Sequence, residues 1–395
     1  MSASPRRKRR TPPRLSGPAR ARLLALILIA LLAVGGCSAL LPPVRAAART
    51  ALLMPAFFAQ LPVDPTAWGA PPVRRSDVSL GGAFPGAVLH VYRPALGRHP
   101  AFLISLGVDP APPDDPRVVR LLSGFAQSGI VAALVESPDL NAERLATNEP
   151  ALIVRAYQTL AGEPFVDAKR VGLFGFSVGG ALVLIAAADP SIRGQVRLVE
   201  AFGAYDRVSS LMRAAVTRRL NLNGRLTAWQ PDDLTVEALR LNLIGGLPSA
   251  SDRSLLQAAL PNANAPPASA PAGLSPAGQN VYALLTAAGS AQFDSAYAAL
   301  PAKQRQTFAT LSPANYLPQV RAPVYLMVDV GDPLVPFTES AQINAQLRAS
   351  GRRPYFSQFD IFRHVDPTRG GNPPIVLRDV LRLFLHATAV LKREA

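Results

Sequence analysis

Residues 171–180 of the 395-residue chain read Val-Gly-Leu-Phe-Gly-Phe-Ser-Val-Gly-Gly, and this stretch decides the fold. Its first four residues form a short apolar run, which is typical of a strand buried inside a sheet. The next residues, 181–188, are Ala, Leu, Val and Ile only, and they predict a helix. Ser177 therefore lies at a sharp turn between a buried strand and a helix. Gly175 and Gly179 stand two positions away on either side, where such a turn needs small residues.

The turn has the form G-x-S-x-G, and its geometry has a chemical purpose. A strained strand-to-helix turn exposes the serine hydroxyl and directs the positive end of the following helix at a developing oxyanion. The motif alone arises by chance in many chains, but here a buried strand precedes it and a helix follows it. The sequence therefore predicts Ser177 as a nucleophile and the Val178 N–H as an oxyanion donor.

A serine nucleophile needs a base, and two histidines follow Ser177 in the chain. His386 falls within an amphipathic pattern over 373–391, where a packed or surface histidine is expected. His364 lies between the last expected strand and that final helix, where a loop can reach the carboxyl edge of the sheet. We therefore expect His364 to be the base.

The base needs an acid to orient it, and the usual chain order on such a sheet is serine, acid, histidine. Asp332 directly follows the apolar run 324–330, so we expect it in a loop at the carboxyl edge. Two alternatives stay open. Asp329 falls within the expected strand, and Glu200 lies one strand earlier.

Outward from the motif, strands and helices alternate from about residue 77. Segments typical of strands, either alternating or mostly apolar, occur at 88–92, 101–106, 130–135, 171–174, 196–202, 324–330 and 355–359. This alternation predicts an α/β fold with a mostly parallel sheet and helices on both faces.

The alternation stops between residues 207 and 317. Helical patches appear there at 234–244 and 281–287. We therefore expect a core built from residues 77–206 and 318–395, with 207–317 inserted as a helical cap.

The N-terminus has the order of a secretory signal. Eight basic residues and no acidic residue lie in the first 36 positions, and residues 23–34 are wholly apolar. Two interpretations stay open: residues 1–37 are a signal that ends at Cys37, or 23–41 is an uncleaved membrane anchor. Residues 38–76 follow as a stalk and lead-in, with a possible short helix over 52–61.

Composition narrows the possible partners. The net charge is +15, but eight of these charges lie in the basic N-terminus, and the rest form no stripe. This pattern argues against nucleic-acid binding. The chain has one cysteine, which excludes an internal disulfide, and four histidines dispersed along the sequence. We therefore expect no metal site and no cofactor.

Three segments resemble the α/β-hydrolase superfamily, nearest to dienelactone hydrolase-like and prolyl-oligopeptidase-like serine esterases. They are residues 175–180 (GFSVGG), 322–336 and 362–367 (FRHVDP). The resemblance implies Ser177 as nucleophile, Asp332 as acid and His364 as base. The dienelactone hydrolases themselves use a cysteine nucleophile, so their particular activity is not implied.

Many members of that superfamily carry a His-Gly pair after the third strand, beside the oxyanion. Here residues 105–108 read Ser-Leu-Gly-Val, so the glycine is kept and the histidine is not. Because backbone N–H groups are the donors, we expect the oxyanion hole at Val178 and at Gly107 or Val108.

Residues 34–37 (VGGC) resemble the bacterial lipobox. The resemblance implies a diacylglyceryl anchor on Cys37, and a catalytic domain on the extracytoplasmic side of the bacterial cell membrane. The sequence thus favours a membrane-tethered hydrolase that cleaves a small ester or acyl substrate through an acyl-enzyme. A non-catalytic binding protein with the same fold, or an acyltransferase that uses an alcohol in place of water, are the alternatives.

Overall fold

The computed structural model describes residues 41–58, 72–222, 224–262, 269–366 and 372–393. The expected signal, the lipobox and Cys37 lie outside these residues. Within them, no helix is both long and apolar enough to cross a membrane.

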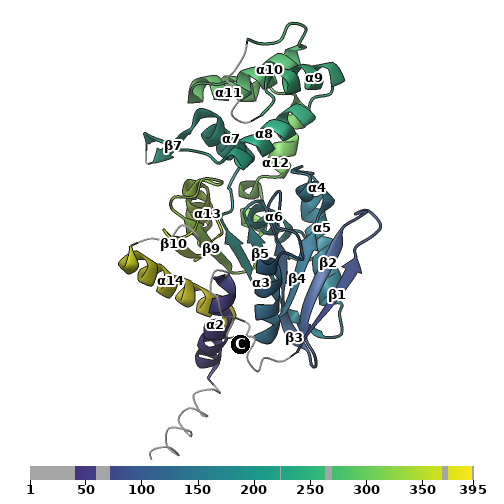
Figure 1. The fold of residues 1–395 in the computed structure, drawn as a ribbon, viewed down its shortest axis with the longest axis vertical. Coiled ribbons are helices and arrows are strands. Elements are labelled where there is room, and N and C mark those ends of the chain that lie inside the picture. Colours follow the sequence, from purple (N-terminus) through teal and green to yellow (C-terminus); the bar gives the residue numbers. More distant parts are fainter. Residues whose placement is uncertain (1–40, 59–71, 223, 263–268, 367–371, 394–395) are drawn as a thin grey trace, which may run out of the picture.

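Eight strands of the described residues form one twisted sheet in the order β1-β2-β4-β3-β5-β6-β9-β10 (Figure 1). Strands β4, β3, β5, β6, β9 and β10 are parallel, and β2 is antiparallel to both of its neighbours. Their bounds are β1 Val73–Ser79, β2 Val88–Pro94, β3 His99–Ser105, β4 Val131–Glu136, β5 Val166–Phe176, β6 Val199–Phe202, β9 Val324–Asp329 and β10 Tyr355–Phe359. The predicted α/β class with a mostly parallel sheet is confirmed.

The central strands of the sheet are covered on both faces, so their side chains are apolar in both directions. In β3, Leu103 packs into the core on one face, while Phe102 and Ile104 pack into the core on the other. The helices that cover the two faces are α5 (Glu149–Ala161), α6 (Val178–Ala186) and α13 (Phe337–Ala349) on the first, and α2 (Pro42–Phe57), α3 (Pro116–Gln127) and α14 (Pro373–Leu391) on the second.

Helix α2 lies in the stretch for which the sequence predicts a stalk and lead-in. It packs against α14 and α3, with Leu53 and Ala56 buried. A Cβ atom placed on Gly124 of α3 would come within 2.7 Å of the Ala56 Cβ. The helix is therefore part of the core and covers one face of the sheet.

The segment between β6 and β9 forms a helical cap over one end of the core (Figure 1). Its elements are α7 (Val208–Thr217), the hairpin β7 (Arg219–Leu222) and β8 (Arg225–Ala228), α8 (Asp233–Gly245), α9 (Ala250–Ala259), α10 (Pro276–Leu285), α11 (Ser290–Ala298) and α12 (Ala302–Thr310). The hairpin is a feature that the sequence analysis does not predict.

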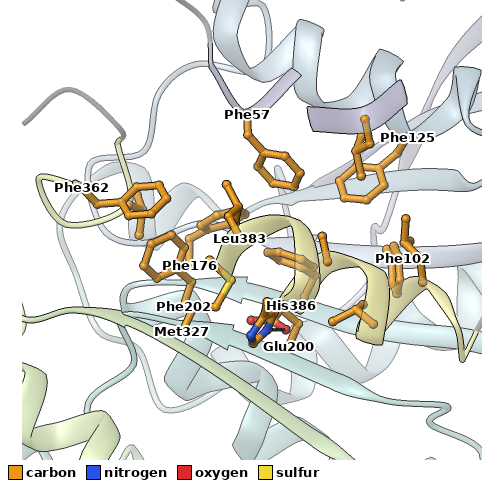
Figure 2. Close-up of a pocket in the computed structure, with 16 residues that line it drawn as sticks. Phe57, Phe102, Phe125, Phe176, Glu200, Phe202, Met327, Phe362, Leu383 and His386 are labelled. Atoms are coloured by element: carbon orange, nitrogen blue, oxygen red, sulfur yellow. Dashed lines mark hydrogen bonds and ion pairs between the residues drawn. The ribbon is translucent and has the colours of Figure 1, made fainter. Parts of the chain in front are cut away.

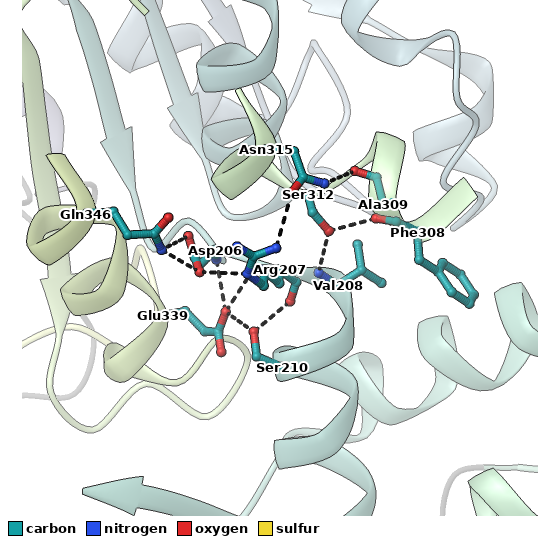
Figure 3. A network of polar contacts seen from close by, with 10 residues as sticks. All are labelled: Asp206, Arg207, Val208, Ser210, Phe308, Ala309, Ser312, Asn315, Glu339 and Gln346. Carbon is teal, nitrogen blue, oxygen red and sulfur yellow. Dashed lines mark hydrogen bonds and ion pairs between the residues drawn. The ribbon is translucent and has the colours of Figure 1, made fainter. Parts of the chain in front are cut away.

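Both ends of the cap meet in one polar network beside the core (Figure 3). Glu339 of α13 accepts hydrogen bonds from the Asp206 N–H (2.9 Å) and the Ser210 hydroxyl (2.8 Å) where the chain enters α7. Where the chain leaves the cap, the Ser312 hydroxyl accepts from the Val208 N–H at 3.1 Å. The two connections therefore lie side by side, and the core helix α13 holds the entering one.

Candidate active site

Ser177 occupies a strained turn at the end of β5. Its backbone has φ 55° and ψ −128°, a conformation that residues other than glycine rarely adopt. The Ser177 N–H donates to the Phe202 carbonyl at 2.8 Å, and α6 begins at the next residue. The strand and helix on either side thus hold the turn in place.

Two glycines are required by the closeness of the backbone around this turn. A Cβ on Gly175 would lie 2.4 Å from the Gly179 carbonyl oxygen, and one on Gly179 would lie 2.2 Å from the Ser105 carbonyl oxygen. Both distances are too short for any side chain. The spacing in G-x-S-x-G therefore reflects a turn pressed against the end of β3.

Gly107 leaves a small open space beside the serine hydroxyl. A Cβ placed on Gly107 would lie 2.9 Å from the Ser177 Cβ, 3.1 Å from its Oγ and 3.7 Å from the Val178 nitrogen. The Val178 N–H belongs to the first turn of α6, so it has no acceptor within its own helix. A small group beside Oγ could thus meet a free backbone donor, as an oxyanion hole requires.

His364 and Asp332 form a buried pair on the loops that follow β10 and β9. Asp332 Oδ2 lies 2.6 Å from His364 Nδ1, and its Oδ1 accepts from the N–H groups of Leu334 (2.8 Å) and Val335 (3.0 Å). Because an ionised carboxylate can only accept, Nδ1 carries the proton and Nε2 presents its lone pair. Nε2 has no hydrogen-bond partner among the described residues, so Ser177 Oγ is not bonded to it in this structure.

The other two candidate acids hold different partners. Asp329 ends β9, and its carboxylate accepts from the N–H groups of Gly331 (2.8 Å) and Phe362 (2.9 Å). Glu200 Oε2 lies 2.8 Å from His386 Nε2. Of the three acids considered, Asp332 is the one for which the structure gives a hydrogen bond to His364.

Several residues that the sequence analysis does not single out support the pair. A Cβ on Gly203 would lie 2.9 Å from His364 Cε1, so only glycine leaves room for the imidazole. From the cap, Trp229 Nε1 donates to the Asp332 carbonyl at 3.0 Å, and the Thr235 hydroxyl donates to the Leu334 carbonyl at 2.8 Å. The cap therefore holds the acid loop directly.

Ser177 and His364 line one pocket of about 340 Å³, within the range of small-molecule sites. Gly107, Val108 and Val178 line it too, so all the predicted oxyanion residues border the same space.

The rest of the wall is mostly apolar and comes from two parts of the molecule. The cap contributes residues such as Leu211 of α7 and Ala238 of α8. Helices α2 and α3 contribute residues such as Phe57 and Leu121.

The described residues contain no group of three or more His, Cys, Asp or Glu side chains placed to hold a metal ion.

No protein-family model and no curated protein sequence matches the chain. Solved structures do match. Acylaminoacyl peptidase from Pyrococcus horikoshii aligns with a TM-score of 0.50 at 12% identity, over 83% of this chain and 43% of that one. A puromycin-hydrolyzing peptidase of Mycobacterium tuberculosis aligns with a TM-score of 0.51 at 15% identity, over 84% and 41%.

A thermostable esterase from Pseudomonas putida ECU1011 aligns with a TM-score of 0.49 at 17% identity, over 87% of this chain and 89% of that one. This chain spans less than half the length of the two peptidase chains. At such identities the likeness to the peptidases concerns the fold, and with the sheet order and the Ser177 turn it leads to one conclusion: the chain has the α/β-hydrolase fold.

Proposed function

We propose that this protein is a serine hydrolase that cleaves an ester-like bond in an apolar substrate through an acyl-enzyme on Ser177. One observation supports this above all. Ser177, in its strained turn, shares a pocket with His364, whose Nδ1 is fixed by Asp332 and whose Nε2 has no partner in the described part of the chain.

The residues suggest a definite course for the reaction. As Ser177 Oγ attacks the substrate carbonyl carbon, His364 Nε2 takes the hydroxyl proton, and Asp332 stabilises the imidazolium that forms. The oxyanion lies in the space beside Gly107 and accepts from the Val178 N–H. His364 then protonates the leaving alcohol, and water, activated by the same nitrogen, frees the acid from Ser177. Closure of the pocket around a substrate brings Oγ and Nε2 together, since such hydrogen bonds are often long without ligand.

Labelling with a fluorophosphonate probe tests the proposal, because the probe reacts covalently with an activated serine. We expect wild-type protein to be labelled and Ser177→Ala to remain unlabelled. Ser340→Ala is the matched control: Ser340 is a buried serine whose hydroxyl donates to the Ala204 carbonyl at 2.9 Å, away from the pocket. A folded wild-type protein that resists labelling, or a Ser177→Ala protein that is still labelled, contradicts the proposal.

We also propose that the N-terminus tethers the domain to the bacterial membrane, on the extracytoplasmic side. The support is in the sequence: basic residues, an apolar run and Cys37, only five residues before α2 begins at Pro42. Cell fractionation of wild type and Cys37→Ala checks this. Wild-type protein found in the soluble cytosolic fraction contradicts a tether of either kind, and Cys37→Ala protein that stays bound and uncleaved favours a spanning anchor.

A further inference from the structure

A second cavity lies on the other side of the pocket wall, between the sheet and the helices α2, α3 and α14. Its volume is about 40 Å³, so in the present side-chain positions it has room for only a few atoms. Figure 2 shows phenylalanine rings gathered around it, among them Phe57 of α2, Phe125 of α3 and Phe202 of β6. We refer to it as the aromatic cavity.

The aromatic cavity begins directly beside the candidate active site. Phe57, Phe176 and Val365 line both the aromatic cavity and the pocket that contains Ser177. Phe176 is the residue before Ser177, and Val365 is the residue after His364. The two spaces therefore share part of their lining, including the side chains next to the nucleophile and the base.

The polar groups of the cavity are two neighbouring side chains. Glu200 and His386 lie together on one side of it (Figure 2), with Glu200 Oε2 and His386 Nε2 2.8 Å apart. His386 Nδ1 lies 2.8 Å from the Ser357 hydroxyl, so both ring nitrogens have partners, whereas Glu200 Oε1 has none among the described residues. The other residues that line the cavity are all apolar, so most of the surface that it offers a ligand suits hydrocarbon.

We infer that the aromatic cavity is the end of an acyl-chain subsite. The inference rests on the proposed function and specifies its substrate: an ester whose aliphatic acyl chain runs from Ser177 past Phe57 of α2 into the cavity. The alcohol part of the ester occupies the part of the pocket that the cap lines. Helix α2, through Phe57, thereby becomes a determinant of acyl-chain length.

Two matched alanines test whether the acyl chain occupies the aromatic cavity or the part of the pocket that the cap lines. Ala387 of α14 lines the aromatic cavity and not the Ser177 pocket, whereas Ala238 of α8 lines the pocket under the cap and not the cavity. Both are buried, at 8% and 7% exposure. The measurement is kcat/KM of the full chain for p-nitrophenyl octanoate and p-nitrophenyl acetate.

We expect Ala387→Leu to lower the octanoate-to-acetate ratio about tenfold or more, since added methyl groups fill space that the chain needs. Ala238→Leu should change the two rates together. A folded Ala387→Leu protein with an unchanged ratio, or a ratio that falls only in Ala238→Leu, overturns the inference. Leu383→Ala, which enlarges the cavity from the same helix, should raise the ratio of laurate to octanoate ester and covers the case in which Ala387→Leu does not fold.

Binding of sodium decanoate separates this inference from the proposed function. Titration calorimetry on full-chain Ser177→Ala protein needs no turnover. We expect the Kd for decanoate to rise about tenfold when Ala387→Leu is added, and to stay within about twofold when Ala389→Leu is added instead. Ala389 lies on the same helix but does not line the cavity. If decanoate does not bind, or binds the three proteins with equal affinity, the subsite is overturned even if Ser177 hydrolyses esters. If binding depends on Ala387 but the wild-type protein hydrolyses no ester, the subsite stands and the proposed function is overturned.

Discussion

Two buried histidine–carboxylate pairs can be compared in this molecule: His364 with Asp332, and His386 with Glu200. Their nitrogen–oxygen distances are similar, 2.6 and 2.8 Å, and both histidines are almost wholly covered, at 6% and 1% exposure. By distance and burial alone, either pair could be a base with its orienting acid.

The second nitrogen of each imidazole distinguishes the pairs. His386 lies in α14, and its other nitrogen meets the Ser357 hydroxyl at 2.8 Å. His364 lies in a loop with φ 62° and lines the Ser177 pocket, and its other nitrogen has no partner within the described residues. A histidine suited to catalysis is thus distinguished here by an unused ring nitrogen and a place in the wall of the nucleophile's pocket, more than by its carboxylate.

The largest expected effect comes from removing the carboxylate of each pair in turn. Asp332→Asn leaves the wrong imidazole tautomer populated, and we expect turnover of a short p-nitrophenyl ester to fall by about 10⁴. Glu200→Gln should keep near-full turnover, because Glu200 orients a histidine that does not border the Ser177 pocket. If Asp332→Asn keeps its activity while a folded Glu200→Gln loses it, the two pairs have the opposite roles.

Much of this comparison follows from the sequence, because the relevant signals are local. An apolar run marks β9, a short segment with three aromatic residues marks β10, and the pattern over 373–391 coincides with α14 (Pro373–Leu391). Loop positions after these strands then point to Asp332 and His364. Chain order and strand ends are enough to bring such residues to one edge of a parallel sheet.

What the sequence does not reveal depends on contacts between distant segments. Glu200 and His386 are 186 positions apart, and neither has a local pattern that predicts the other. Trp229 reaches the acid loop across the cap boundary, and no periodicity signals that contact. Helix α2 falls within the predicted stalk and lead-in, whose Ala, Pro and Arg content hides its apolar face: beside Leu53, the buried positions of the helix are the small residues Ala46, Thr50 and Ala56.

The second prediction concerns stability, where the ranking of the two pairs should reverse. His386→Ala leaves Glu200 buried without its partner, and we expect the free energy of unfolding in urea to fall by about 3–5 kcal/mol. The folded fraction should keep its turnover of p-nitrophenyl acetate, whose acyl group is too short to need the aromatic cavity that His386 lines. Replacing both residues by leucine should recover much of the loss, since no uncompensated charge remains. A His386→Ala protein as stable as wild type would mean that this pair does not stabilise the fold.

A third buried carboxyl, Glu339, extends the comparison because it accepts hydrogen bonds from N–H and hydroxyl groups where the chain enters the cap (Figure 3). Burial raises the pKa of Glu339 from about 4.5 to about 7, against the opposing effect of these hydrogen bonds. The folded state therefore holds a proton that the unfolded state releases, and Glu339 makes stability fall as pH rises from about 4.5 through 7.

Glu339→Gln should remove this part of the pH dependence. We expect the variant to gain stability relative to wild type on the order of 3 kcal/mol between pH 4.5 and pH 8, since glutamine keeps an acceptor and never ionises. Urea unfolding at both pH values measures the difference. The burial of Glu149 also raises its pKa to about 7, but it is present in both proteins and cancels. If the free energy of unfolding changes with pH by the same amount in both proteins, Glu339 does not titrate in this range.

The smallest effect we expect concerns how the cap holds one pair and not the other. Trp229→Phe keeps the ring but removes the N–H that donates to the Asp332 carbonyl at 3.0 Å. One such hydrogen bond contributes about 0.5–1.5 kcal/mol, so turnover should fall about two- to tenfold if the bond fixes the acid loop. The dependence of turnover on pH should change as well, because a less firmly held Asp332 interacts differently with His364. A purely structural role of Trp229 would leave this pH dependence unchanged.

Thr227→Val is the matched control, since the Thr227 hydroxyl donates to the Leu220 carbonyl within the β7–β8 hairpin and does not reach the acid loop. Equal turnover and equal pH profiles in all three proteins would mean that the cap encloses the pocket without positioning the acid, and that the loop after β9 holds Asp332 unaided through the N–H groups of Leu334 and Val335.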